Sequence, residues 1–261
     1  MFVGGLHRSG TSMAARALAR HPEVSGLTGT DVKEDEGQHL QDVLPPARAY
    51  GGAGRFALDP RAHLTEESPL ASADNADRLL VQWAPYWDLD KRVLVEKSPP
   101  TLVRTRLLQA LVPGAHFVLV VRHPVVVSLS TRKWRRGVPF AALLEHWFAA
   151  HETLLADLPH LGSAHVVKYE HLVRDPGAVF AELASALGLA GEVPVDTVRA
   201  DASDRYRRDW DRWSHTRVPW RRAEYRGLVD RFEERARAFG YTMTDLAVAD
   251  PFPLLPGGVQ A

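Results

Sequence analysis

Four short apolar runs rich in β-branched residues alternate along this chain with segments of helical period. This alternation limits the possible folds more than any other feature of the sequence. The runs are nearly continuously apolar, which is typical of strands buried on both faces of a sheet. Strands separated by helical segments are expected to pair in parallel. We therefore predict an α/β fold, a parallel sheet flanked by helices, with strands at Met1–Val3, Arg92–Val95, His116–Val121 and His165–Lys168.

Seven segments between and after these runs carry a helical pattern. Pro22, Pro113 and Pro159 closely follow three of them, at positions where a proline ends a helix rather than interrupting it. The predicted helices are Ser12–Arg20, Ala73–Trp83, Thr101–Val112, Val125–Arg135, Phe140–Ala156, Gly177–Leu187 and Trp220–Phe239.

Two long segments are predicted to be irregular. Gly26–Arg61 is rich in Gly, Pro and acidic residues, and Ala200–Pro219 is crowded with Arg, Asp, Trp and Tyr. Long irregular segments in a compact domain usually form lids or binding loops. The 261 residues are enough for one large core. We expect a single domain over residues 1–261, with an acceptor or lid loop at about 26–61 and a surface tail at about 250–261.

Charge and composition exclude several classes of function. The 32 Lys and Arg residues balance 32 Asp and Glu residues, so no net field attracts nucleic acid. The absence of Cys rules out disulfides, thiolate metal sites and a cysteine nucleophile. The longest apolar run stops at Arg122, short of the roughly 20 residues that span a membrane, and the chain does not start like a signal peptide. We expect a cytoplasmic protein without stable membrane insertion, and the sequence leaves the oligomeric state open.

A glycine-rich loop follows the first predicted strand and precedes the first predicted helix. Its residues are Gly5-Leu6-His7-Arg8-Ser9-Gly10-Thr11-Ser12, with two glycines at the spacing of a phosphate-binding loop. Backbone N–H groups and a helix N-terminus in such a loop attract an anion. The alternative is an ordinary turn capped by Ser9 or Ser12. Placement at the first strand-to-helix turn, where such sheets bind ligands, favours the anion site.

The loop differs from that of a nucleotide triphosphatase at one decisive position. Thr11 stands where the phosphate-binding lysine belongs, and the positive charge lies inside the loop at Arg8. The strand His116–Val121 is followed by Arg122 rather than by the aspartate of a magnesium site, and the histidine spacing indicates no metal. We therefore expect an anion site that works without a metal ion.

Basic residues follow two further strands. Lys97, one of only five lysines, comes directly after the second predicted strand, where an ammonium group can neutralise charge on a leaving oxygen. Arg122 follows the third strand, and Ser130 lies eight residues later on a helix, so both side chains can reach one phosphate. Each feature also has an ordinary structural explanation. Lys97 could form a salt bridge, Arg122 could cap the edge of the sheet, and the Ser130 hydroxyl could donate to a backbone carbonyl of its helix.

Together these motifs resemble the sulfotransferases that use 3′-phosphoadenosine 5′-phosphosulfate (PAPS). The loop is similar to the family's 5′-phosphosulfate loop, in the form found in tyrosylprotein sulfotransferases and many bacterial members. Val121-Arg122-His123-Pro124 through Ser130 resembles the 3′-phosphate motif, although His123 stands where Asp or Asn is common. Glu96-Lys97-Ser98-Pro99 is similar to a segment of the heparan-sulfate branch, and Lys168-Tyr169-Glu170-His171-Leu172 to a recurrent block after another strand. The resemblance spans roughly residues 1–240.

The resemblance implies a P-loop nucleotide-kinase-like fold, PAPS as co-substrate and no metal. It implies that Lys97 assists sulfuryl transfer and that Tyr169 lies near the adenine. The acceptor is expected to be a hydroxyl or amine of a small molecule, glycan or lipid. The residues expected to bind the nucleotide are Leu6, His7, Arg8, Ser9, Gly10, Thr11, Ser12, Arg122, Ser130 and Tyr169.

The reaction also needs a base that takes the acceptor's proton. The acidic segment Asp31–Gln41 follows the first helix and should return over the ligand crevice. It resembles a block of bacterial relatives, and we expect Glu36 to be the base ahead of His39 and then Glu34. The alternative is a solvated acidic loop.

Aromatic residues give a weaker indication. The Arg, Tyr and Trp residues of 205–213 suit either adenine stacking or a solvated amphipathic surface, which we favour. Trp83, Trp87, Trp134 and Trp147 suit either an acceptor pocket or the core. Two other functions stay open: a kinase with a degenerate loop, and a nucleotide or phosphate sensor without turnover.

Overall fold

The computed structural model describes residues 1–198 and 201–253. Its centre is a sheet of five strands in the order β2-β3-β1-β4-β5, and all four neighbouring pairs are parallel. The predicted α/β fold, a parallel sheet flanked by helices, is therefore confirmed. The strands are β1 (Phe2–Gly4), β2 (Val24–Gly26), β3 (Val93–Lys97), β4 (Phe117–Val121) and β5 (Ala164–Lys168).

Strand β2 is absent from the sequence prediction. It has only three residues, which is too few for a periodic pattern to be recognised. Its position is fixed by pairing, because Val24 lies opposite Val93 at the edge of the sheet. The four predicted strands all occur in the structure, within two residues of their expected limits at each end.

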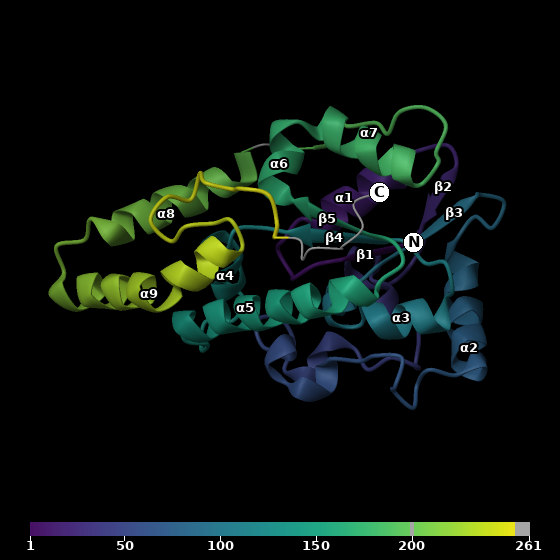
Figure 1. Cartoon of the computed structure of the whole chain (residues 1–261), viewed down its shortest axis with the longest axis horizontal. Coiled ribbons are helices and arrows are strands. Elements are labelled where there is room, and N and C mark those ends of the chain that lie inside the picture. The colour runs from purple at the N-terminus through teal and green to yellow at the C-terminus, as the bar shows by residue number, and fades with distance from the viewer. Residues whose placement is uncertain (199–200, 254–261) are drawn as a thin grey trace.

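Helices cover both faces of the sheet (Figure 1). One apolar core lies against α1 (Thr11–Leu18), α6 (Tyr169–Arg174) and α7 (Pro176–Ala186). The larger core lies on the other face. Its helices are α2 (Ala73–Trp83), α3 (Thr105–Leu111), α4 (Pro124–Arg132) and α5 (Phe140–Asp157).

Two helix predictions need correction. The helix expected from Thr101 begins only at Thr105, because Pro99–Val103 forms a 3₁₀ turn after two consecutive prolines. The segment predicted as irregular from Ala200 contains helix α8 (Asp204–Ser214), while residues 199–200 lie outside the described part. Charge obscured its pattern, but Tyr206 and Trp210 are buried one helical turn apart. Helices α8 and α9 (Pro219–Ala238) project side by side from the body (Figure 1).

The long loop between β2 and α2 is built from five short 3₁₀ turns, η1 to η5, between Lys33 and Ala62. Part of it packs firmly, because Val43, Leu44 and Phe56 are buried in the larger core. Packing therefore holds the middle and end of the loop, whereas its acidic start borders the carboxyl edge of the sheet. Its use as an acceptor loop stays a prediction.

The predicted surface tail is wrong at Phe252, although Asp250 and Pro251 are exposed. Phe252 is buried and its ring lies 5.6 Å from that of Phe239, and the Asp250 N–H donates to the Gly240 carbonyl. Residues 254–261 lie outside the described part. Within the part that is described, the helices are all too short or too polar to cross a membrane.

Candidate active site at the carboxyl edge of the sheet

Three neighbouring strands end at one place on the sheet. Val3 lies opposite Lys97, and Gly4 lies opposite Leu119, so the residues that follow β1, β3 and β4 meet at the same edge. The glycine-rich loop, Lys97 and Arg122 are therefore brought together by the strand register. This is the arrangement in which parallel sheets bind ligands.

The glycine-rich loop is shaped by two glycines. Gly5 has φ 149°, and a Cβ on it would lie 2.4 Å from the Val120 carbonyl oxygen. Gly10 has φ 102°, and its Cβ would lie 2.6 Å from the Tyr169 ring. Arg8 between them also has a positive φ, 75°. These values place a tight backbone loop directly before α1.

The polar groups of the loop are not used to cap the helix. Gly10 is the N-cap of α1, and no side chain accepts a hydrogen bond there. The Ser9 hydroxyl is buried without a partner among the described residues. The alternative of a turn capped by Ser9 or Ser12 is therefore wrong. A buried, unused hydroxyl beside a helix N-terminus fits an anion cradle.

Arg8, Arg122 and Ser130 form a second cluster next to the loop. The Arg8 Nε donates to Ser130 Oγ at 2.8 Å. Arg122 Nη1 donates to the Arg8 carbonyl oxygen at 3.0 Å, and the Arg122 guanidinium lies 3.9 Å from the centre of the Tyr169 ring. Burial lowers the pKa of Arg122. The predicted loop and the predicted 3′-phosphate pair thus adjoin, with Tyr169 packed between Gly10 and Arg122.

Three residues of this cluster were not predicted from the sequence. The Arg122 Nη2 donates to Ser203 Oγ at 2.7 Å. The Tyr206 hydroxyl donates to Ser130 Oγ at 2.9 Å and accepts a hydrogen bond from Lys133 Nζ at 2.9 Å. Ser203 and Tyr206 come from the segment that was read as irregular. The helical spacing of Tyr206, Trp210 and Trp213 is the sequence signal that indicates helix α8.

His123 takes the structural place of the Asp or Asn that is common in the 3′-phosphate motif. Its Nδ1 accepts a hydrogen bond from the Val125 N–H at the start of α4, which is the role of an N-cap carboxylate or amide. Its Nε2 donates to the Thr242 carbonyl oxygen at 3.1 Å. The departure from the motif therefore preserves the helix start that positions Ser130.

Lys97 and Glu36 form an ion pair at the end of β3, with 3.4 Å between Lys97 Nζ and Glu36 Oε1. Their side chains are only 6% and 13% exposed, so solvent screens the pair weakly. Burial lowers the pKa of Lys97, and the Glu36 carboxylate opposes that effect. The salt bridge that was the ordinary explanation for Lys97 therefore exists, and its partner is the carboxylate expected to be the base.

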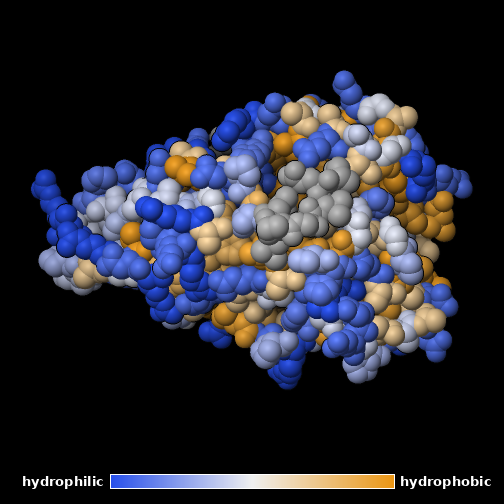
Figure 2. Space-filling model, viewed as in Figure 1, coloured by the Kyte–Doolittle hydropathy of each residue, from blue (hydrophilic) through white to orange (hydrophobic). Residues whose placement is uncertain are grey.

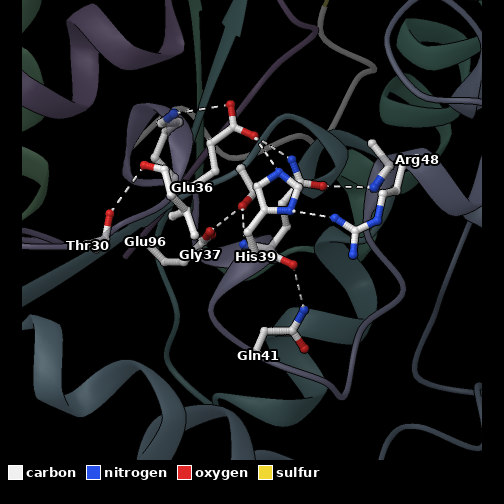
Figure 3. A network of polar contacts seen from close by, with 12 residues as sticks. Thr30, Glu36, Gly37, His39, Gln41, Arg48 and Glu96 are labelled. Carbon is white, nitrogen blue, oxygen red and sulfur yellow. Dashed lines mark hydrogen bonds and ion pairs between the residues drawn. The ribbon is translucent and has the colours of Figure 1, made fainter.

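His39 lies beside the same carboxylate (Figure 3). Its Nε2 is 3.7 Å from Glu36 Oε2, and its Nδ1 faces Arg48 Nη1 at 3.5 Å. Burial lowers the pKa of His39. Glu34 is placed differently, because it pairs with Arg16 at the surface. The structure brings two of the three base candidates to Lys97 and directs the third away.

Gln38 holds Glu36 in position. Its side-chain amide donates to Glu36, its backbone N–H donates to Ser98 Oγ at 2.8 Å, and its Oε1 accepts from the Ala47 N–H. A Cβ on Gly37 would lie 2.5 Å from the Glu96 carboxylate, so the loop passes close to β3 at this point. The acidic segment is thus fixed to the strand rather than being a solvated loop.

Comparison with known proteins identifies the family. The profile described as "Sulfotransferase family" matches residues 1–193, about three quarters of the chain. The chain belongs to the sulfotransferase family. Helices α8 and α9 lie beyond the matched residues.

This chain has a distant curated relative. It is 27% identical over 202 residues to protein-tyrosine sulfotransferase 2 of Gallus gallus, covering 73% of this chain and 51% of that protein. It therefore spans about half the length of this curated relative.

Two solved structures share the fold. One is the sulfotransferase domain of a Synechococcus olefin synthase, with TM-score 0.51, 22% identity and coverage of 79% and 86% of the two chains. The other is a sulfotransferase from Alicyclobacillus acidocaldarius, with TM-score 0.51, 19% identity and coverage of 90% and 94%.

The four tryptophans considered for an acceptor pocket have different positions. In this sulfotransferase Trp83 and Trp147 are buried in the core, and Trp87 is partly buried with its Nε1 donating to the Val95 carbonyl. Trp134 is 51% exposed. Its ring lies between the Arg8 guanidinium at 4.7 Å and Lys33 Nζ at 4.8 Å. Of the four, Trp134 alone borders the site.

The Arg and Trp stretch at 205–213 mainly forms a solvated helix, as favoured above. Exposed charges such as Arg205, Arg208 and Arg212 cover the outer face of α8, and hydrophilic residues dominate this end of the molecule (Figure 2). Elsewhere in the structure, residues 1–198 and 201–253 contain no group of three or more His, Asp or Glu side chains arranged to hold a metal ion.

Buried histidines predict an acid-sensitive fold. Burial lowers the pKa of His123, His146 and His151 to about 3, from 6.5. Below pH 6.5 the unfolded chain binds protons that the folded chain excludes, so stability falls as pH falls. Glu96 acts oppositely, since burial raises its pKa to about 7, so between pH 7 and 4.5 the folded chain holds a proton that the unfolded chain releases.

His7 adds to the loss, because burial lowers its pKa to about 4. Four histidines opposed by Glu96 leave a net expected loss of roughly 4 kcal/mol per pH unit between pH 6 and 5. Urea denaturation at pH 7.5, 6.5 and 5.5 measures it. The variant His123→Asn keeps an N-cap without a titratable ring, so the slope should fall by about one third. A slope that is unchanged in this variant would show that His123 is not excluded from protonation.

Proposed function

We propose that the chain transfers a sulfuryl group from PAPS to a hydroxyl or amine of an acceptor molecule. The observation that carries this proposal is the contact between two anion-binding motifs. The Arg122 guanidinium lies 3.0 Å from the carbonyl oxygen of Arg8 in the glycine-rich loop, and Arg8 Nε lies 2.8 Å from Ser130 Oγ. Adjoining cationic sites suit a nucleotide with a phosphate at each end of its ribose.

The proposed roles follow from position. The loop from Leu6 to Ser12 holds the 5′-phosphosulfate with its backbone N–H groups, the Ser9 hydroxyl and Arg8. Arg122 and Ser130 hold the 3′-phosphate, and Ser203 and Tyr206 orient them from the side of α8. Tyr169 lies beside the Arg122 guanidinium, where it bounds the nucleotide site.

Sulfuryl transfer is mainly a matter of positioning and of stabilising charge. The bond between sulfur and the bridging phosphate oxygen breaks while the acceptor oxygen or nitrogen bonds to sulfur. Negative charge grows on the bridging oxygen, and the Lys97 ammonium neutralises it. The acceptor's proton passes to Glu36, whose carboxylate is held by Gln38 and lies next to Lys97.

Substitution of the proposed base gives a direct test of its identity. Glu36→Gln keeps the shape of the side chain but cannot accept the proton, so the turnover number should fall by about 10²–10⁴-fold while nucleotide affinity stays within a few fold. Glu34→Gln is the matched control, because Glu34 pairs with Arg16 at the surface. Initial rates of product formation measure both variants. Equal losses in the two variants would contradict the role of Glu36, and a larger loss in His39→Asn would assign the base to His39.

The acceptor site is proposed to lie between Glu36, Lys97 and Trp134. Trp134 offers an exposed aromatic wall beside Arg8, and Lys33 of the acidic loop closes its other face. The curated relative is by its name a protein-tyrosine sulfotransferase, whose acceptor is a phenol. We infer an acceptor with a hydroxyl group on a small molecule, glycan or lipid, and we place the loop at 26–61 over it within a single domain of residues 1–261.

Two other functions are less well supported. A kinase needs the lysine that Thr11 replaces, and the 3′-phosphate motif has no place in that reaction. A sensor without turnover does not need Lys97 paired with a carboxylate beside the donor site. Incubation with PAPS and a panel of phenols, sugars and lipids in the presence of EDTA tests the proposal. Sulfated product with stoichiometric release of the nucleotide product supports it, and Mg²⁺-dependent phosphate transfer from ATP would overturn it.

A further inference from the structure

A buried arginine behind the Lys97 strand has unused hydrogen-bond donors. Arg104 directly precedes α3 and is 2% exposed, and its Nε and Nη2 are buried without a partner among the described residues. The guanidinium carbon lies 5.7 Å from the centre of the Tyr50 ring. A buried guanidinium normally forms several hydrogen bonds or an ion pair, because its desolvation costs a large free energy. This position therefore lacks a partner that the charge requires.

Arg104 lines a small polar cavity between β3, the start of α3 and the acidic loop. Glu96, Ser98, Gln38 and Gln41 contribute its polar wall. The space measures about 270 Å³ where it opens toward solvent, and its inner part has room for a particle of about the size of a water molecule. The cavity is separate from the glycine-rich loop, whose residues do not line it.

Three other polar residues of this wall already have hydrogen-bond partners. Gln41 donates to the Gln38 and Leu44 carbonyls and accepts from the Leu44 N–H. Gln38 uses its side-chain amide on Glu36 and Ala47. Ser98 donates to Glu96 Oε1 and accepts from the Gln38 N–H. The unused N–H groups belong to Arg104, so a ligand of this cavity must accept hydrogen bonds rather than donate them.

Glu96 decides whether Arg104 has a counter-ion within the wall. Its carboxyl group is buried, and burial raises its pKa to about 7. The charged groups that act on it are Lys97 on the same strand, Glu36 on the loop and the amino group of Met1 on β1. Glu96 acts in turn on Arg104 across the cavity. Below pH 7 the protonated form of Glu96 dominates, which leaves the Arg104 cation without an anion.

We propose that this cavity is a binding site for one small monovalent anion of about the size of chloride, held by Arg104. Binding is favoured by the neutral form of Glu96, because two anions in one closed space repel each other. The site reaches the reaction centre through its wall. Gln38 and Ser98 line the cavity and also support the proposed reaction centre. Gln38 holds Glu36, and Ser98 directly follows Lys97 and accepts a hydrogen bond from the Gln38 N–H. Anion binding therefore stabilises the loop that carries the proposed base, but the site itself does not depend on the sulfuryl-transfer proposal.

The test measures the melting temperature of the full chain at constant ionic strength. Chloride replaces gluconate, which is too bulky to enter the cavity. An anion at tenfold excess over its Kd should raise Tm by about 3–5 °C. The increase should be larger at pH 6 than at pH 8, because Glu96 releases its proton between them. Tm is read without PAPS, so the result is separate from the outcome of any activity assay.

Two variants distinguish this cavity from the phosphate-binding loop, which also attracts anions. Arg104→Gln should lose the difference between chloride and gluconate. Glu96→Gln should keep the increase in Tm at pH 8, because its amide stays neutral. Arg61→Gln is the control, since the Arg61 side chain is 77% exposed and pairs with Asp59 at the surface. If Arg104→Gln does not fold, the increase in Tm of Glu96→Gln at pH 8 still tests whether the anion binds in this cavity. An equal increase in Tm in Arg104→Gln would place the anion elsewhere, and destabilisation of Glu96→Gln that neither anion relieves would make Glu96 itself the counter-ion.

Discussion

Replacing Arg122 by alanine is expected to weaken binding of the product nucleotide, 3′-phosphoadenosine 5′-phosphate (PAP), by about 10²–10⁴-fold. Two charge-assisted hydrogen bonds to a phosphate are lost, each worth about 1.5–3 kcal/mol. Arg122 is also the residue that joins the motifs, through the Arg8 carbonyl and Ser203 Oγ. Its loss therefore removes a ligand contact and loosens the loop.

Calorimetric titration with PAP measures this change. Arg136→Ala is the matched control, because Arg136 is an exposed arginine shortly after the same helix. Arg122→Lys keeps the charge without the planar fork and should recover only part of the affinity. The far-UV spectrum checks that each variant is folded, since Arg122 is buried. Affinity within threefold of the unmodified chain in Arg122→Ala would remove the 3′-phosphate site from the account.

Replacing Lys97 by alanine is expected to lower turnover by about 10²–10³-fold while PAP affinity changes only a few fold. The reason is that Lys97 stabilises charge that develops on the bridging oxygen as the reaction proceeds, and this charge is small in the bound substrate. The substitution also releases Glu36 from its ion pair of 3.4 Å. The released carboxylate stays a competent base, so the loss of turnover is expected to come from the unstabilised charge on the leaving oxygen.

Parallel measurement of turnover and PAP affinity separates this role from a structural one. Lys91→Ala is the control, because Lys91 lies at the surface before the same strand and pairs only loosely with Asp88. A purely binding function, such as a nucleotide sensor, predicts no turnover in the unmodified chain and unchanged PAP affinity in Lys97→Ala. A loss of PAP affinity as large as the loss of turnover would contradict the proposed role of Lys97.

The sequence predicted the sheet well because its strands are buried on both faces. A strand such as Phe117–Val121, with every residue buried, leaves a short continuous apolar run rich in β-branched residues, which is typical of a buried strand. The edge strand Val24–Gly26 was missed because three residues carry no period. Helix α8 was missed because its many charges hide a stripe of only two buried side chains, Tyr206 and Trp210.

The candidate site was predictable where its residues follow strands. Residues 5–12, Lys97 and Arg122 sit at strand ends, and parallel register brings strand ends together. Ser203, Tyr206 and Lys133 join the site through packing of distant segments, since Arg122 and Ser203 are 81 positions apart in the sequence. No local pattern encodes that contact. The choice of Glu36 over Glu34 also needed coordinates, because both carboxylates lie in one acidic run and only packing separates them.

The most direct test of the central claim is calorimetric titration of the chain with PAP in EDTA, compared with adenosine 5′-phosphate and adenosine 3′-phosphate. The claim is that one nucleotide is held at both of its phosphates by adjoining motifs without a metal ion. The account predicts one PAP site per chain, with each single-phosphate nucleotide bound at least 10²-fold more weakly, as expected for the loss of charge-assisted contacts. Equal affinity for PAP and adenosine 5′-phosphate, or binding that requires Mg²⁺, would contradict it.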